Sequence, residues 1–200
     1  MNRDKKVFTA VAAIYENPET KSMGLWMWHN HVQWVADKTR QLSNKYNANE
    51  EMAVSAALLH DLADSRYDRD DSLFDKWSEE KAFEVLKEAD FTEEEAEEIV
   101  EIIIRPHSCR PGKLPTTPEG KVLATADAIF HLQTSFFTAL CYQNRPSSIK
   151  SLEAWQTWCE EKIEKNYNSK IFFEDEKAEV TADYEALGRV FGNKSLKGIE

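Results

Sequence analysis

The chain has 200 residues, 42% of them hydrophobic and 30% charged, and its 36 acidic against 25 basic residues leave a formal net charge of −11. These proportions are typical of a folded globular domain and exclude a disordered chain. The acidic balance also excludes a broad nucleic-acid surface, because phosphate backbones bind to basic faces.

The spacing of apolar residues predicts helices along nearly the whole chain, and no strand pattern of period two persists. In chain order, the predicted helices cover residues 7–14, 25–42, 52–62, 79–88, 93–104, 118–140, 149–167 and 174–191. Asn49 and Ser78 are expected to cap two of them, and Thr92 with Glu95 forms a capping box. The helix over 52–62 is apolar on all sides, which predicts a place at the centre of a bundle.

We therefore expect an all-α fold of seven to eight helices in one domain, residues 1–191, followed by a flexible tail, 192–200. The first twenty residues lack the apolar segment of a signal peptide, and no apolar stretch approaches the length of about eighteen residues that a membrane span needs. The three cysteines form no C-x-x-C motif, so we expect reduced thiols in a cytoplasmic protein without a membrane partner.

A few polar residues stand in otherwise apolar helical segments. His60 and Asp61 lie in the sequence AALLHDLAD, His31 lies between Trp28 and Val32, and Asp127 lies in KVLATADAI. A buried imidazole or carboxylate is costly unless it is paired or binds a metal. Two imidazoles and two carboxylates suit one divalent ion with open positions, for which we favour manganese, iron, cobalt or nickel, with magnesium also acceptable.

The order His31, His60-Asp61, Asp127 resembles that of the HD-domain metal-dependent phosphohydrolases, whose four metal ligands occupy these positions. The resemblance implies an HD-type helical bundle with its metal-site core at about residues 25–141 and C-terminal helices at 149–191. The stretch from His60 to Arg66 is similar to the His-Asp-x-x-Asp-x-Lys stretch of small stand-alone bacterial members, some of which hydrolyse nucleoside triphosphates. Arg66 stands where those members usually carry Lys.

The expected activity is metal-dependent hydrolysis of a phosphate ester or phosphoanhydride in a small phosphorylated metabolite, with a nucleotide as the first expectation. Asp64 is the expected general base or acid, and Asp61 is expected to share that duty. Positive side chains must neutralise the phosphoryl oxygens. The candidates for binding substrate are Arg66, Arg69, Arg105, His107, Arg110 and Lys113.

Three questions stay open at this point. The same pocket could serve a nucleotide-sensing or regulatory module that keeps the metal site but turns over little substrate. The chain could also form a homodimer, and His131, one turn after Asp127, is a further residue that could face the cleft.

Overall fold

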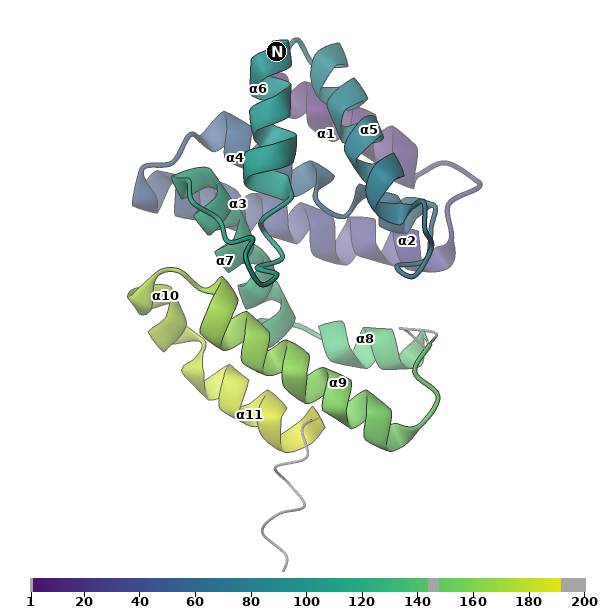
Figure 1. Ribbon diagram of the computed structural model, residues 1–200, viewed down its shortest axis with the longest axis vertical. Helices are drawn as coiled ribbons and strands as arrows, with labels where there is room; N and C mark the ends of the chain where they lie inside the picture. The colour runs from purple at the N-terminus through teal and green to yellow at the C-terminus, as the bar shows by residue number, and fades with distance from the viewer. Residues whose placement is uncertain (1, 144–147, 192–200) are drawn as a thin grey trace, which may run out of the picture. The chain divides into compact units, whose positions relative to one another are not determined.

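The computed structural model describes residues 2–143 and 148–191 (Figure 1). Within these ranges the chain is helical and forms no β-strand, although an isolated antiparallel bridge joins Arg110 and Lys113. The all-α prediction is therefore confirmed. The predicted flexible tail, 192–200, lies outside the described residues.

The helices follow one another closely along the chain. The α-helices are α1 (Arg3–Tyr15), α2 (Ser22–Trp26), α3 (Gln33–Tyr46), α4 (Glu50–Leu59), α5 (Phe74–Glu88), α6 (Glu93–Glu97), α7 (Pro118–Gln133), α8 (Phe136–Tyr142), α9 (Leu152–Lys165), α10 (Glu174–Glu179) and α11 (Thr181–Phe191). Three π-helical segments directly continue α2, α6 and α9, and they cover Met27–Val32, Glu98–Ile104 and Asn166–Lys170. A short 3₁₀ helix, Leu62–Ser65, follows α4.

The described residues hold eleven α-helices, more than the seven to eight predicted, because three predicted helices are each divided. The predicted helix over 25–42 divides into α2 and α3 at the π-helical segment Met27–Val32. The predicted helix over 118–140 divides into α7 and α8 at Thr134, whose hydroxyl donates to the Phe130 carbonyl at 2.7 Å. A side chain that bonds to the carbonyl four residues earlier competes with the helical ladder. The predicted helix over 174–191 divides into α10 and α11 at the buried Val180.

The capping predictions hold at two of three helices. The Asn49 side chain accepts from the Met52 amide at 3.3 Å, and Thr92 with Glu95 forms the predicted capping box. The prediction at Ser78 is wrong, because α5 already begins at Phe74. Just before the N-terminus of α5, the Asp71 carboxylate accepts a hydrogen bond from the Leu73 amide at 2.8 Å.

The chain divides into two compact units, one within residues 1–126 and the other within residues 127–200, and we describe each by itself. In the first unit α4 packs against α1, α3 and the π-helical segment Glu98–Ile104 (Figure 1). All residues from Met52 to Leu59 are buried, as expected for the central helix of a bundle.

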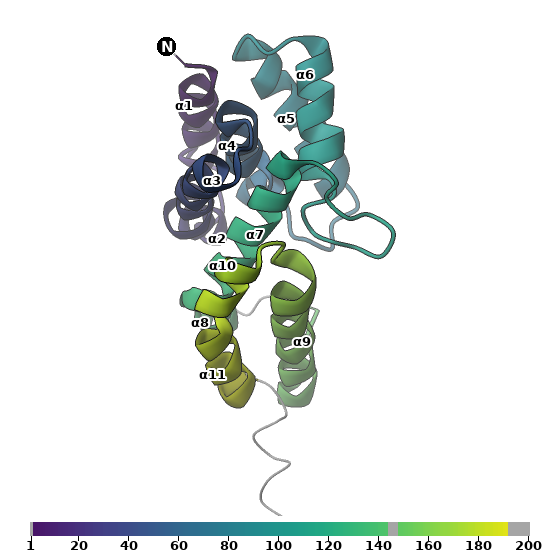
Figure 2. The same ribbon diagram turned by 90° about the vertical axis from the view of Figure 1, so that its left-hand side faces the viewer.

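In the second unit α9 and α11 lie side by side, and α10 joins the end of the α9 segment to α11 (Figure 2). Helix α7 begins in the first unit and ends in the second. Among the described residues, no helix combines the length and the apolar character that crossing a bilayer requires.

Candidate metal centre

The His60-Asp61 pair lies where α4 ends. His60 still has helical dihedral angles, whereas Asp61 leaves the helix with φ −119° and ψ 25°. The sequence predicted that both residues lie inside a helix over 52–62, whereas the structure places them at the C-terminal end of that helix. Adjacent side chains on a helix diverge by about 100°, and the end of α4 at this position allows both to turn toward one point.

Two contacts hold this turn from outside. The buried Tyr15 hydroxyl donates to the Asp61 carbonyl at 2.6 Å. Gly24 of α2 lies against the following 3₁₀ turn so closely that a Cβ atom would be 2.9 Å from the Asp64 carbonyl oxygen and 2.9 Å from the Ser65 Cα. Any side chain at Gly24 would therefore displace the turn that carries Asp64.

Three potential ligand atoms meet at this point of the first unit. His31 Nε2 lies 3.0 Å from His60 Nε2 and 3.1 Å from Asp61 Oδ2, and His60 Nε2 lies 3.5 Å from the same oxygen. Nitrogen and oxygen ligands bound at about 2.1 Å to one ion are separated by about 3 Å. The donor set and its spacing thus fit a divalent metal ion, and all three residues are buried.

The hydrogen bonding of His60 supports this fit. Its Nδ1 lies 2.7 Å from the Ala57 carbonyl oxygen, which can only accept, so Nδ1 carries the proton. In the neutral ring, the lone pair is then on Nε2, the atom that faces His31 and Asp61. A backbone carbonyl on the second ring nitrogen is the usual arrangement for a metal-binding histidine.

His31 reaches this point from a π-helical segment. It lies in Met27–Val32, between α2 and α3, and is fully buried. Single π-helical turns within α-helices occur often at functional sites, because the wider turn redirects one side chain. His29, two residues earlier in the same segment, is exposed.

Asp61 and Asp64 share one arginine. Arg69 Nη2 lies 2.8 Å from Asp61 Oδ2, and Arg69 Nε donates to Asp64 Oδ1 at 3.1 Å, while Nη2 also donates to Asp64 Oδ2. Burial raises the pKa of Asp61, but Arg69, His60 and His31 outweigh it and hold this pKa well below its usual range. Burial raises the pKa of Asp64 to about 6, against the opposing charge of Arg69.

The predicted substrate-binding residues are spread over several places in the first unit. The ring of His107 stands edge-on to that of His60, with centroids 5.1 Å apart, and its Nδ1 donates to the Ile104 carbonyl at 2.5 Å. The Arg66 guanidinium lies over the rings of Tyr67 and Trp77.

The basic residues of the segment 105–119, which contains four of the six prolines, have acidic or backbone partners. Arg105 pairs with Glu79 at 2.5 Å and also with Glu101, and Arg110 Nη1 lies 3.8 Å from Asp75 Oδ2. Lys113 belongs to the tight turn that Arg110 begins, with its amide donating to the Arg110 carbonyl at 2.9 Å. Of the residues predicted to bind substrate, the structure thus brings His107 and Arg69 to the His60-Asp61 turn.

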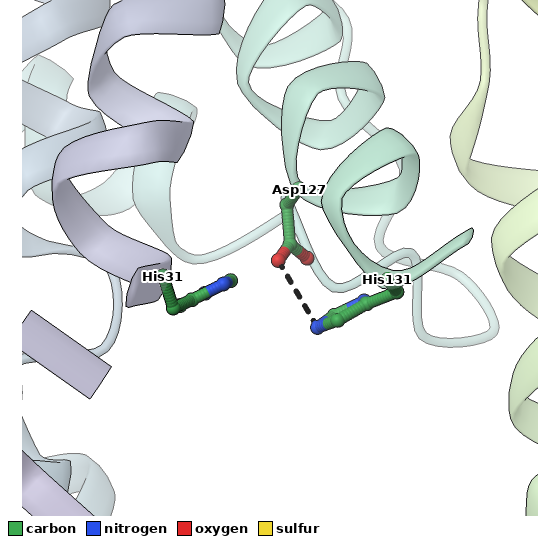
Figure 3. Close-up of side chains that lie close together, drawn as sticks. All are labelled: His31, Asp127 and His131. Carbon is green, nitrogen blue, oxygen red and sulfur yellow. Dashed lines mark ion pairs between the residues drawn. The ribbon is translucent and has the colours of Figure 1, made fainter. Parts of the chain in front are cut away.

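Asp127 belongs to the second unit, where it lies on α7. Figure 3 shows it one turn before His131, with Asp127 Oδ1 and His131 Nε2 3.5 Å apart. Its other oxygen, Oδ2, accepts a hydrogen bond from the buried Lys170 ammonium, and His131 Nδ1 lies 3.3 Å from Asn166 Oδ1. Asp127 is therefore a buried carboxylate with a lysine and a histidine around it.

Sequence reasoning missed Tyr15, Gly24 and Lys170. Tyr15 and Gly24 act through backbone contacts with a distant turn, for which a single sequence carries no signal. Lys170 precedes the apolar run Ile171-Phe172-Phe173, and this neighbouring run was the one available indication that its ammonium is buried.

Compared with known protein families, residues 28–130 match the model of the HD domain. This range spans half of the chain and contains His31, His60, Asp61, Asp64 and Asp127. No curated protein and no solved structure shows a significant match.

Proposed function

This chain belongs to the HD-domain family, whose members are mostly metal-dependent hydrolases, and from that premise we propose that it hydrolyses a phosphate ester or phosphoanhydride of a small phosphorylated metabolite. The observation that carries the proposal is the group of three ligand atoms, His31 Nε2, His60 Nε2 and Asp61 Oδ2, within 3.5 Å of one another.

The proposed ligands of one divalent ion are His31, His60 and Asp61, with Asp127 as the fourth. Asp127 is included because its place in the chain follows the order of ligands in the family, and because it is a buried carboxylate. We propose manganese, iron, cobalt or nickel, with magnesium as a further candidate, since mixed imidazole and carboxylate sites suit these ions. When bound, such an ion supplies Lewis acidity toward water and toward a phosphoryl oxygen.

The chain's own residues have separate tasks in this reaction. Asp64 accepts the proton of the attacking water at its carboxylate and returns a proton to the leaving oxygen. Asp61 holds its negative charge, because Arg69 and two histidines surround it. His60 keeps its proton on Nδ1, where the Ala57 carbonyl accepts it, and therefore presents Nε2 to the site.

Positive groups near the turn receive the phosphate. Arg69 and His107 lie beside the ligand atoms, and Arg66 follows on the same segment, so these three are the first candidates. Arg105, Arg110 and Lys113 remain predictions for the more distant parts of the substrate. A nucleotide is the proposed substrate class, on the basis of the resemblance between residues 60–66 and the nucleotide-cleaving members.

One observation favours a second function. Arg69 donates to both oxygens of Asp64, so the proposed proton acceptor is already engaged. A module that senses a nucleotide and turns over little of it would tolerate this arrangement better than an enzyme that relies on a free Asp64.

A single set of measurements separates the two functions. The full chain is stripped of metal with a chelator, reloaded with Mn²⁺, and assayed against nucleoside mono-, di- and triphosphates, with elemental analysis of the purified protein. We expect hydrolysis that disappears with the chelator and returns with Mn²⁺, and D64N should bind the nucleotide but turn it over about 10²- to 10⁴-fold more slowly. Nucleotide binding without turnover in the unmutated chain would support the sensor, and a chain that binds no divalent ion would refute both.

A further inference from the structure

Arg69 bridges the two carboxylates of the His60-Asp61 turn. Its Nη2 lies 2.8 Å from Asp61 Oδ2, and its Nε and Nη2 form a fork on the carboxylate of Asp64. Such a bidentate pair is among the strongest contacts that an arginine makes with an acid. Arg69 is therefore anchored mainly on Asp64 and reaches Asp61 with one nitrogen.

The oxygen that Arg69 reaches is the one that both histidines face. Asp61 Oδ2 lies 3.1 Å from His31 Nε2 and 3.5 Å from His60 Nε2, and it is the oxygen that completes the group of three ligand atoms. The Arg69 guanidinium next to Asp61 Oδ2 places a permanent positive charge close to the position that a divalent cation would occupy. Like charges a few ångströms apart repel strongly where water is scarce.

Arg69 is more exposed to solvent than Asp61 and Asp64, the two acids that it contacts. Its side chain is 55% exposed, whereas those of Asp61 and Asp64 are 8% and 11% exposed. Apart from the two carboxylates, the guanidinium lies over the ring of Phe74 at 5.5 Å. The arginine can thus move into solvent while the carboxylates stay in place.

We propose that Arg69 competes with the divalent ion for Asp61 Oδ2 and, once displaced from that oxygen, offers the freed N–H groups to a phosphoryl oxygen of the substrate. The inference rests on the proposed function and adds an order of binding, in which the divalent ion binds before the phosphate. Arg69 Nη2 contacts both Asp61 Oδ2 and Asp64 Oδ2 and leaves both in the exchange, whereas the bond from Arg69 Nε to Asp64 Oδ1 persists. The guanidinium thus stays beside the site, and Asp64 Oδ2 becomes available to accept a proton.

Metal affinity tests the competition directly. Mn²⁺ is titrated into the metal-free full chain by calorimetry for the unmutated protein, R69Q, R69K and R3Q. R69Q removes the competing charge and is expected to bind Mn²⁺ about tenfold more tightly. R69K keeps the charge but its single ammonium cannot span both acids, so a gain of about threefold is expected. R69K also tests the competition if R69Q does not fold.

The matched control is R3Q. Arg3, like Arg69, bridges two acids of the first unit, in this case Glu51 and Glu95, but it lies outside the site. R3Q is expected to leave the Mn²⁺ affinity unchanged. If both Arg69 variants bind Mn²⁺ equally well or more weakly than the unmutated chain, Arg69 is not a competitor and the inference is overturned.

Phosphate binding tests the second half of the exchange. Orthophosphate is titrated into the Mn²⁺-saturated proteins, and R69Q is expected to bind it about tenfold more weakly while R3Q does not change. An unchanged orthophosphate affinity in R69Q would overturn the transfer of Arg69 to the phosphate. Failure of the unmutated chain to bind Mn²⁺ at all would instead refute the proposed function.

Discussion

Each of the two units contains a buried carboxylate with a cationic partner, and the two pairs differ in their access to water. In the first unit Arg69 contacts Asp61, and the arginine side chain is 55% exposed. In the second unit Lys170 contacts Asp127, and the lysine side chain is only 6% exposed. The acids are alike in burial, because only 8% of the Asp61 side chain and 4% of the Asp127 side chain are exposed.

The difference in exposure between Arg69 and Lys170 indicates that water or another ligand can replace the arginine more easily than the lysine. An exposed ion pair contributes about 0–1 kcal/mol to stability, and the Arg69–Asp61 pair shares part of this character, because water can replace the exposed guanidinium. Removing one member of a buried pair costs about 3–5 kcal/mol, because the other charge stays behind without compensation. The exposure of Arg69 thus agrees with the exchange that we propose for it, whereas Lys170 is buried together with Asp127 in the second unit.

The largest expected effect tests this difference in stability. K170M removes the ammonium from Asp127 and is expected to lower the free energy of unfolding by about 3–5 kcal/mol. R69Q, the corresponding change in the first unit, is expected to lower it by about 1–2 kcal/mol, because water can take the place of the exposed guanidinium although two buried carboxylates remain. Urea denaturation of both variants measures the two values. Equal losses would show that the two pairs do not differ in the way their exposure indicates.

The second prediction concerns metal binding in the first unit. H31Q removes one of the three proposed ligand atoms and is expected to weaken Mn²⁺ binding by more than about 100-fold, since even partners outside the ligand shell are worth about 10- to 100-fold. H29Q alters an exposed histidine of the same π-helical segment and should leave the affinity unchanged. Calorimetric titration checks both. A similar loss in the two variants would point to a disturbed segment rather than a lost ligand.

The third prediction concerns the backbone of the His60-Asp61 turn. Y15F deletes the hydroxyl that donates to the Asp61 carbonyl at 2.6 Å. This carbonyl keeps the Asp64 amide as a donor at 3.0 Å, so the loss of one of its two hydrogen bonds is expected to cost about 1.5 kcal/mol of unfolding free energy. Tyr142 is 87% exposed, so Y142F serves as the control and should not alter the stability. No loss in Y15F would mean that the turn is held without this bond.

The smallest expected loss of stability comes from removing Arg3, whose exposure lies between that of Lys170 and that of Arg69. Arg3 is 28% exposed, and hydrogen bonds from it lower the pKa of Glu51 and of Glu95 below the ordinary 4.5. A lowered carboxylate pKa stabilises the fold above the unfolded value and loses its effect as the pH falls through the folded value. R3Q is expected to cost about 1 kcal/mol at pH 7.

That cost should stay constant down to about pH 5 and shrink progressively below 4.5, where the acids of the unfolded chain take up protons first. Urea denaturation of the unmutated chain and R3Q at a series of pH values measures it. A difference that grows on acidification would contradict the direction of these pKa shifts.

The helical fold and the buried polar residues that we propose as ligands in the first unit were accessible from sequence for physical reasons. A helix buried on all sides has an unmistakable apolar pattern, as in α4, and a capping box such as Thr92 with Glu95 works through local contacts. His60 and Asp61 stood out because their apolar neighbours indicated burial. Each of these signals spans only a few residues.

The remaining features depend on contacts between distant residues. Nothing within 52–62 marks the end of α4 at Leu59, because the Tyr15 hydroxyl, far away in the chain, holds the turn that follows. Sequence reasoning could not rank Arg69 above Arg66, since the distinction depends on how the chain after the 3₁₀ helix folds back onto Asp64. The burial of Lys170 depends likewise on α7.

The π-helical segment that carries His31 has a consequence for comparing this chain with its relatives. A π-helical hydrogen bond spans one residue more than an α-helical bond, so Met27–Val32 contains a residue that an uninterrupted α-helix would not need. The helical phases of α2 and α3 are therefore offset by that one residue. A relative with an α-helix throughout this region is expected to align with a single-residue gap inside 27–32, and an alignment without the gap would assign His31 to the wrong column.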